Sequence, residues 1–195
     1  MKPPDSITDG VVALRKLRES DRAVTLSTFS DPLVRQWLNM PPDPRDSDFD
    51  VLLRTVHNGF VSGDRYDYVV TTPPDDSSLG AVIASRRHRD NYEVAYLARA
   101  EGRGRGLMTR AVRLLCDVLF GEGAGRIEVR THPDNLASQH LAARAGFQKE
   151  GVERRSIWLH GERQDAIVWS LLPGDPRSVS DTSSGREALR AAKGV

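Results

Sequence analysis

The feature that most restricts the fold of this chain is a junction between a strand and a helix within residues 93–120. Residues 93–98 alternate with the period of two that is typical of a strand. Residues 107–119 repeat apolar side chains at helical spacing, which predicts a helix with one buried stripe. A strand that runs through a short loop into a buried helix predicts a layered α/β protein.

The loop at this junction alternates glycine and arginine: Gly102, Arg103, Gly104, Arg105, Gly106. The first amides of a helix have no partner inside the helix, and the helix dipole gives them partial positive charge. Glycines let the backbone turn these N–H groups inward, and arginines add charge and paired donors. The junction therefore predicts a site for a pyrophosphate at the amides of residues 104–109.

Other interpretations of this loop stay open on spacing alone. Alternating glycine and arginine also suit a plain turn with solvated charge. The loop is not a Walker loop, because no Gly-Lys-Ser/Thr closes it, and its spacing is not Gly-x-Gly-x-x-Gly. A nucleotide-binding protein is therefore disfavoured.

Composition narrows the class of protein further. The 195 residues suit one domain, and 38% hydrophobic with 28% charged residues is typical of a globular protein. A net charge of +1 argues against nucleic acid as the main partner. The single cysteine, Cys116, excludes an internal disulfide and is expected to be a buried thiol. Neither a signal peptide nor a membrane span is evident, so the cytoplasm is the expected compartment.

The order of predicted elements is strand, two helices, three strands, helix, strand, helix and two strands. We expect residues 1–9 to be flexible, one domain at 10–174, and a mobile tail at 175–195 that could carry a short helix at 186–193. Residues 73–78 are expected to form a turn.

A second informative segment is 135–150. Asn135 is a reasonable N-cap, and Ser138 is then a surface hydroxyl one turn later. The two segments together, however, resemble the GNAT (GCN5-related) N-acetyltransferases. Residues 103–108, Arg-Gly-Arg-Gly-Leu-Met, are similar to the Arg/Gln-x-x-Gly-x-Gly/Ala loop of that family, with Met108 where glycine or alanine is usual. Asn135, Ser138 and the Gly-Phe that follows resemble its RimJ/RimL-like branch, the ribosomal-protein N-terminal acetyltransferases, and the likeness covers residues 10–173.

The resemblance implies a GNAT fold, with a mixed, mostly antiparallel seven-stranded sheet, splayed fourth and fifth strands, and about four helices. It implies transfer of an acetyl group from acetyl-coenzyme A (acetyl-CoA) to a primary amine by direct attack, without a metal. The acceptor would be a protein N-terminus or a small molecule. The sequence does not choose between them, nor between acetyl and longer acyl groups, nor does it fix whether the chain forms the homodimers that are common in this branch.

By the same resemblance the cofactor contacts the fourth strand, the loop and the start of the second helix: Tyr96, Leu97, Ala98, Arg103, Gly104, Arg105, Gly106, Leu107, Met108, Thr109, Asn135 and Ser138. Many GNAT proteins use a tyrosine as acid where this chain has Ala142, so Ser138 is the expected hydrogen-bond donor to the sulfur. Glu93 is the candidate base, acting through water, although it could equally be a surface carboxylate.

Three nearby side chains have two interpretations each. Trp37 could line the acceptor pocket or belong to the core, and the core is the expectation. His132 and His140 could touch the cofactor or the acceptor, but they are expected to be polar residues of a loop and a helix surface, without a third ligand for a metal. A rival function is a non-catalytic acyl-CoA sensor, which would keep the loop and lack acid–base groups. The absence of a tyrosine at Ala142 favours it, and Ser138 speaks against it.

Overall fold

The computed structural model describes residues 3–176. Most of the tail expected at 175–195, including the helix considered at 186–193, lies outside the described residues. No helix within the described part of the chain is long and apolar enough to cross a membrane.

The described residues form one eight-stranded sheet in the order β1-β2-β3-β4-β5-β6-β8-β7. All neighbouring strands are antiparallel except β5 and β6. The mixed, mostly antiparallel sheet is therefore confirmed. The strands are β1 (Ser6–Thr8), β2 (Ala13–Lys16), β3 (Arg65–Thr72), β4 (Asp75–His88), β5 (Asn91–Ala98), β6 (Arg126–Thr131), β7 (Gln148–Leu159) and β8 (Glu162–Leu171).

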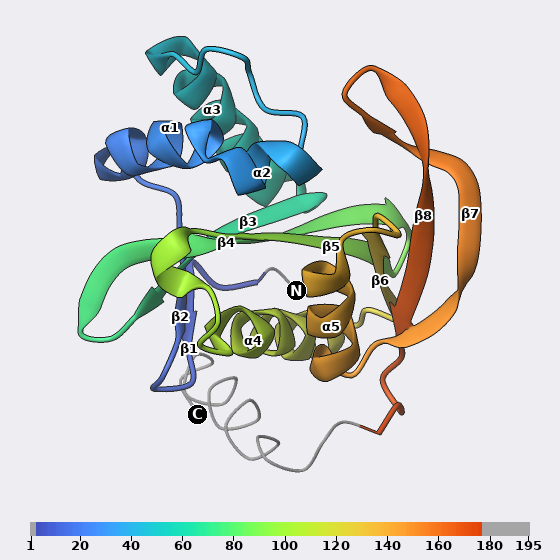
Figure 1. The fold of residues 1–195 in the computed structure, drawn as a ribbon. Helices are drawn as coiled ribbons and strands as arrows, with labels where there is room; N and C mark the ends of the chain where they lie inside the picture. The colour runs from blue at the N-terminus through green and yellow to red at the C-terminus, as the bar shows by residue number, and fades with distance from the viewer. Residues whose placement is uncertain (1–2, 177–195) are drawn as a thin grey trace.

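Helices cover both faces of the sheet. Figure 1 shows α1, α2 and α3 above the sheet, α4 and α5 below it, and the β7–β8 hairpin rising at one edge. The α-helices are α1 (Arg22–Ser30), α2 (Pro32–Trp37), α3 (Asp46–Ser62), α4 (Leu107–Gly121) and α5 (Leu136–Ala145), with short 3₁₀ turns at Glu19–Asp21 and Ala100–Gly102.

Some predicted boundaries are wrong. The expected flexible segment 1–9 contains β1, which pairs with β2, so the sheet has eight strands rather than seven. The expected turn at 73–78 is shorter, because Thr72 already pairs with Asp75 across the hairpin. The five α-helices within residues 3–176 are close to the expected four or so, and the Asp31 side chain begins α2 as a separate helix by accepting the amides of the next turn.

The splay of the fourth and fifth predicted strands is present between β5 and β6. Their parallel ladder has three residue pairs, from Asn91–Arg126 to Glu93–Glu128, and then stops. Beyond that point β5 continues along β4 as far as Ala98, and β6 continues along β8 as far as Thr131. A wedge-shaped opening therefore lies in the middle of the sheet.

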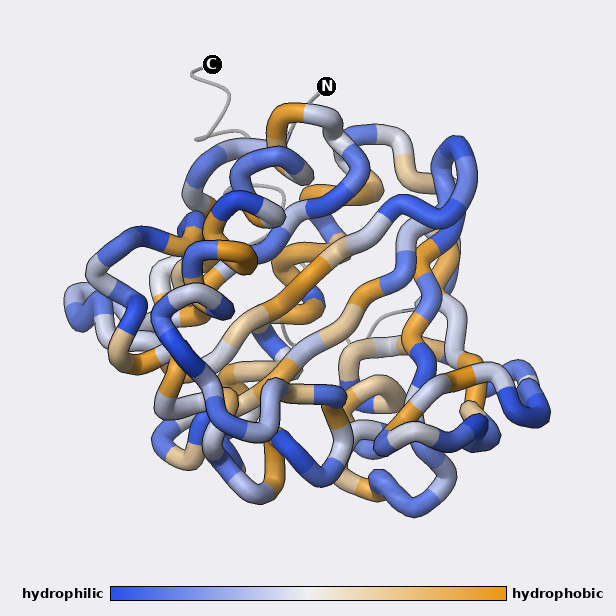
Figure 2. Tube along the Cα trace, turned by 90° about the horizontal axis from the view of Figure 1, so that it is seen from above, coloured by the Kyte–Doolittle hydropathy of each residue, from blue (hydrophilic) through white to orange (hydrophobic). Residues whose placement is uncertain are grey.

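The α4 helix packs its apolar stripe on the sheet beneath this opening. Leu115 and Cys116 are fully buried there, as the single cysteine was expected to be. In Figure 2 the hydrophobic positions follow the central strands, while the loops at the periphery are hydrophilic. The opening is thus framed by the rigid core of the molecule.

β4 approaches β5 unusually closely beside the opening. Gly80 pairs with Ala98 and has a φ of +150°, and a Cβ at this position would stand 2.2 Å from the carbonyl oxygen of Leu97. Only glycine fits such an approach without displacing the backbone of β5.

We predict that Gly80→Ala lowers the free energy of unfolding by about 1–3 kcal/mol, because the methyl group overpacks the β4–β5 ladder. Urea unfolding measures this change. Gly151→Ala is the matched control, since a Cβ there meets no atom within 4 Å. Equal destabilisation by the two variants would show that the close approach at Gly80 is unimportant.

Candidate functional site

The loop before α4 presents backbone N–H groups to an open space. Gly104 and Gly106 have φ of +71° and +74°, and a Cβ at either would meet nothing within 4 Å. Gly106 is the N-cap of α4 and supplies no side-chain hydrogen bond. The first bond into the helix runs from the amide of Arg110 to the carbonyl of Gly106. Within residues 3–176 the amides of 104–109 donate no hydrogen bond, so they form an unsatisfied cradle that fits a diphosphate.

Arginines surround this cradle. A cavity of about 1070 Å³ lies against the loop and the facing ends of α4 and α5, and five arginines line it: Arg103, Arg105, Arg110, Arg113 and Arg144. The last three were missed by the sequence reasoning. Arg110 and Arg113 follow the glycine loop at a helical spacing of three, which is the signal that could have found them.

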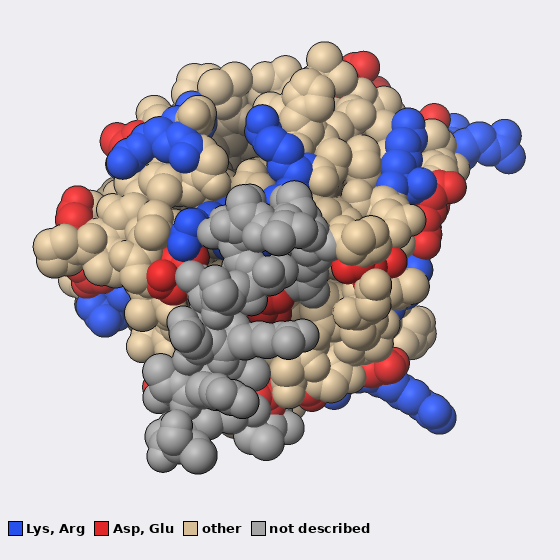
Figure 3. Space-filling view, turned by 90° about the horizontal axis from the view of Figure 1, so that it is seen from below, with Lys and Arg blue, Asp and Glu red and all other residues tan. Residues whose placement is uncertain are grey.

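The positive charge of the five arginines is confined to the cavity and does not extend into a broad basic surface. On the face in Figure 3, outside the grey atoms, basic side chains form separate groups with acidic ones beside them. The arrangement therefore suits a compact anion such as the phosphates of a nucleotide-like cofactor, in agreement with the low net charge of the whole chain.

The two loop arginines differ from each other. Arg103 donates from Nη2 to Asp31 at 2.6 Å and from Nε to the carbonyl oxygen of Ala98 at 3.0 Å. Its guanidinium thus joins α2 to the end of β5 rather than standing free for the anion. Arg105 is exposed and, among residues 3–176, donates only to the carbonyl oxygen of Glu101, at 3.2 Å, so it can turn to a phosphate.

A second cavity of about 460 Å³ occupies the opening between β5 and β6. Tyr96, Leu97 and Ala98 line it together with residues of α2, α5 and the hairpin. The amide of Arg99 bonds to the carbonyl of Leu79 on the β4 side. Because backbone groups alternate sides along a strand, those of Tyr96 and Ala98 face the opening. This is the strand edge that sequence reasoning assigned to the cofactor.

The start of α5 forms the opposite wall of the opening. Asn135 caps the helix by accepting the amide of Ser138 at 3.1 Å, as its position predicted. The phenol oxygen of Tyr96 lies 3.0 Å from the carbonyl oxygen of Ser138 and 3.0 Å from its Oγ. A side chain from β5 thus meets the hydroxyl that was expected to face the sulfur, a contact that the sequence did not reveal.

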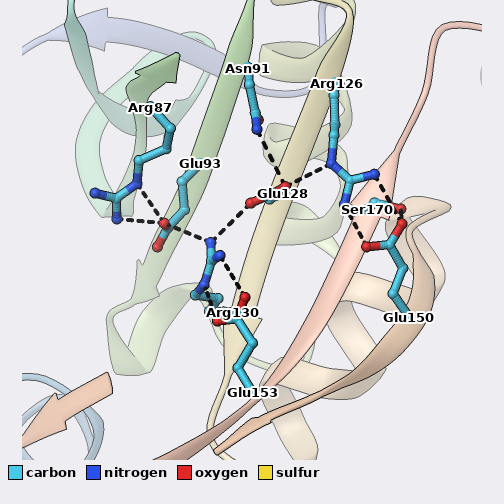
Figure 4. A network of polar contacts seen from close by, with 9 residues as sticks. All are labelled: Arg87, Asn91, Glu93, Arg126, Glu128, Arg130, Glu150, Glu153 and Ser170. Atoms are coloured by element: carbon cyan, nitrogen blue, oxygen red, sulfur yellow. Dashed lines mark hydrogen bonds and ion pairs between the residues drawn. The ribbon is translucent and has the colours of Figure 1, made fainter. Parts of the chain in front are cut away.

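Glu93 lies at the fork where the two strands part. Its Oε2 accepts from Arg87 Nε at 2.8 Å and from Arg130 Nη1 at 3.0 Å (Figure 4). Its side chain is only 18% exposed, so it is not a plain surface carboxylate. Glu93 also lines the opening, and Oε1 has no hydrogen-bond partner among residues 3–176. That oxygen is available to accept a hydrogen bond from a water or from a bound ligand.

The ion pairs at Glu93 belong to a larger network across β4, β5, β6 and β7, to which Ser170 of β8 is joined by a hydrogen bond to Glu150. Arg130 bonds Glu93, Glu128 and Glu153, and Arg126 bonds Glu128 and Glu150 (Figure 4). Hydrogen bonds from Arg126 and Arg130 hold the pKa of Glu150 and of Glu153 below the ordinary value. The network ties the hairpin to the fork.

The remaining wall of the opening is formed by α2 and the tip of the hairpin. Trp37 was expected in the core, but it lines the cavity, with its ring 5.3 Å from that of His132. Its position follows from the end of α2, which lies over the opening. The Asn39 side chain donates to the carbonyl of Trp158 at 2.6 Å and accepts from the amide of His160 at 2.9 Å, so the hairpin tip is fixed to the segment that follows α2.

A model of the "Acetyltransferase (GNAT) domain" matches residues 12–148, well over half of the chain. The chain belongs to the GNAT acetyltransferase family. The likeness inferred from the loop and the Asn135 segment is therefore confirmed. No group of three or more His, Cys, Asp or Glu side chains that could hold a metal ion is present in the described part of this GNAT protein.

Relatives agree with this membership, and a solved structure shares the fold. The chain is 34% identical over 116 residues to the probable N-acetyltransferase YjcK of Bacillus subtilis, a match that spans 57% of this chain and 64% of that protein. It is 25% identical over 130 residues to the [ribosomal protein uS5]-alanine N-acetyltransferase of Escherichia coli, covering 63% of this chain and 66% of that protein. The structure of Mycobacterium smegmatis RimJ in complex with CoA-disulfide superposes with a TM-score of 0.80 at 21% identity, over 99% of this chain and 98% of that one.

We predict that Arg105→Glu weakens CoA binding about 10- to 100-fold, because it replaces a charge-assisted donor by a repelling carboxylate. Isothermal titration with CoA measures the effect. Arg54→Glu is the matched control, since it makes the same charge change at an exposed site on α3 that does not line the arginine cavity. Equal affinity in the Arg105→Glu and Arg54→Glu variants would remove Arg105 from the cofactor site.

The ion-pair network should make the unfolding free energy of the protein depend on pH. The depressed pKa of Glu150 and of Glu153 means that their stabilisation is present above the unfolded pKa and is lost as pH falls through the folded pKa. The unfolding free energy should therefore fall between about pH 5 and pH 3, and less steeply in the double variant Glu150→Gln, Glu153→Gln. Urea unfolding across this range tests it. Glu162→Gln is the control, because within residues 3–176 this hairpin carboxylate accepts from Gln164 and contacts no arginine. An identical slope in the double variant and wild type would contradict it.

Proposed function

We propose that this protein transfers an acetyl group from acetyl-CoA to the nitrogen of a primary amine, by direct attack with both substrates bound. The observation that carries the proposal is the combination of two open features. Amides 104–109 have no hydrogen-bond partner in the described part of the chain, and an opening between β5 and β6 begins beside them. A long cofactor with a diphosphate and an extended arm fits this arrangement.

Each part of the site then has a task. The amides before α4, with Arg105, hold the diphosphate of acetyl-CoA. The backbone of Tyr96 and Ala98 pairs with the extended pantetheine arm of the same molecule. Met108 does not weaken this role, since its amide is what contacts the anion and its side chain is buried. Acetyl-CoA supplies the activated acyl carbon, and this chain needs no nucleophile of its own because the amine attacks directly.

The base at the fork is Glu93. As the new C–N bond forms, the amine gives up a proton, and the unpartnered Oε1 of Glu93 can take it through a water. The two arginines on Oε2 hold the carboxylate in place and leave Oε1 without a hydrogen-bond partner among residues 3–176. The position of Glu93 in the cavity wall supports this role.

The lining of the opening favours a monoamine over a polycation. Its charged groups are Arg103, Arg130 and Glu93, and both arginines are already paired, Arg103 with Asp31 and Arg130 with Glu93, Glu128 and Glu153. Glu93 is the one carboxylate among the described lining residues, so a second ammonium group would be buried there without a carboxylate partner. The wall formed by α2 and the hairpin is mostly apolar, including Trp37 and Ile157. We therefore propose a peptide N-terminus with a small or apolar first side chain as acceptor, rather than a polyamine or an aminoglycoside.

A thiol-release assay with acetyl-CoA tests both parts of the proposal. N-terminal peptides with Ala or Ser first should turn over, while spermidine and kanamycin should not. Turnover of the polycations alone would reject the peptide acceptor. CoA binding without turnover on any amine would favour the acyl-CoA sensor, the alternative that the missing hydroxyl at Ala142 supports.

We predict that Glu93→Gln lowers kcat about 100- to 10,000-fold with the best acceptor, because the amide cannot accept the proton. The CoA dissociation constant should stay unchanged. Glu153→Gln is the control, since it also removes a carboxylate from Arg130 but does not line the opening. Full activity of Glu93→Gln would exclude Glu93 as the base.

A further inference from the structure

The contact between Tyr96 and Ser138 bridges the two walls of the opening. Tyr96 belongs to β5 beyond the last residue paired with β6, and Ser138 belongs to the first turn of α5. The phenol oxygen lies 3.0 Å from each of the two Ser138 oxygens. Both residues also line the cavity, so their polar groups meet at its surface.

The contact between Tyr96 and Ser138 contains two hydroxyl protons, which can be arranged in two ways. The phenol has one proton and two acceptors within reach, and the serine hydroxyl has one proton. In one arrangement Tyr96 donates to the carbonyl of Ser138, and the serine proton points back to the phenol oxygen. In the other Tyr96 donates to Ser138 Oγ, and the serine proton is free to point into the opening. The heavy atoms occupy the same places in both.

No other group competes for the serine hydroxyl. A serine in a helix often donates to a carbonyl of the preceding turn, which would turn its proton away. Within residues 3–176, Ser138 Oγ has Tyr96 as its only hydrogen-bond partner. The direction of its proton is therefore decided by Tyr96.

Burial keeps the phenol protonated. Desolvation raises the pKa of Tyr96 to about 12, although the hydrogen bond with Ser138 acts in the opposite direction. An ordinary thiol has a pKa of about 8.5, so proton transfer from this phenol to a thiolate is strongly uphill. Tyr96 suits a lasting hydrogen-bond donor rather than an acid.

We propose that Tyr96 is a positioning residue that donates to Ser138 Oγ and so aims the serine proton at the departing sulfur of CoA. The inference rests on the proposed function. As the C–N bond forms and the C–S bond breaks, the sulfur keeps the electron pair of the broken bond. Ser138 stabilises this anion by a hydrogen bond without giving up its proton, and the proton of the amine leaves through Glu93. Tyr96 and Ser138 together take the place of the tyrosine that many GNAT proteins have at the position of Ala142.

The pKa of the CoA thiol in the binary complex tests this directly, and it needs no acceptor. It is measured from the ultraviolet absorbance of the thiolate during a pH titration. The wild-type complex should lower the thiol pKa below that of free CoA. Ser138→Ala and Tyr96→Phe should each raise it by about one unit relative to the wild-type complex, and the double variant should raise it no further. Tyr96→Phe should also lower kcat about tenfold while leaving the CoA dissociation constant unchanged.

Tyr92→Phe is the matched control. It makes the same exchange on the same strand, and Tyr92 is buried away from Ser138 in contact with the ring of Tyr66. It should leave the thiol pKa and kcat as in wild type. Thermal unfolding of each variant verifies that the fold is kept, which is expected because Phe retains the ring.

Three results would overturn the inference. They are a wild-type thiol pKa in the Tyr96→Phe complex, additive shifts in the double variant, or no effect of Ser138→Ala. Turnover of an amine alongside any of them would leave the proposed function intact. A failure of the protein to bind CoA at all would instead reject the proposed function, and the inference with it.

Discussion

The early end of the pairing between β5 and β6 is the constraint on which the rest of the structure depends. After Glu93 and Glu128 the two strands follow different neighbours, β5 along β4 and β6 along β8. An unpaired strand edge is usually a liability that proteins cover. Here it lies inside the molecule, framed by α2, α5 and the hairpin, and so its polar groups are kept for a ligand. Arg130 holds the fork together by bonding carboxylates on three strands.

Much of the cofactor side could be predicted from the sequence because its signals are local. The glycines before α4, the apolar stripe of that helix and the Asn135 cap each depend on residues a few positions apart. Such features depend on backbone conformation and on helix termini, and a few neighbouring residues determine both. The family likeness added the mixed, mostly antiparallel sheet and the splay.

The rest depends on contacts between distant segments. β1 is only three residues long and exists because it pairs with β2, so it has no pattern of its own. The sequence pattern predicts Trp37 in the core, and only the contact between α2 and His132 shows that it lines the opening. The environment of Glu93 comes from Arg87 on β4 and Arg130 on β6. The acceptor side is built from such contacts, including the bond pair from Asn39 to the hairpin tip, which explains why the sequence does not choose the acceptor.

The burial of Cys116 has a chemical consequence for the proposed reaction. Each turnover would liberate a free thiol beside α4, and thiols exchange readily with any accessible sulfur under oxidising conditions. The only cysteine of the chain is fully enclosed on the sheet side of that helix, with none of its surface reachable. The native protein therefore offers its own product no sulfur with which to form a mixed disulfide, and oxidative self-capture of this kind would first require α4 to come away from the sheet.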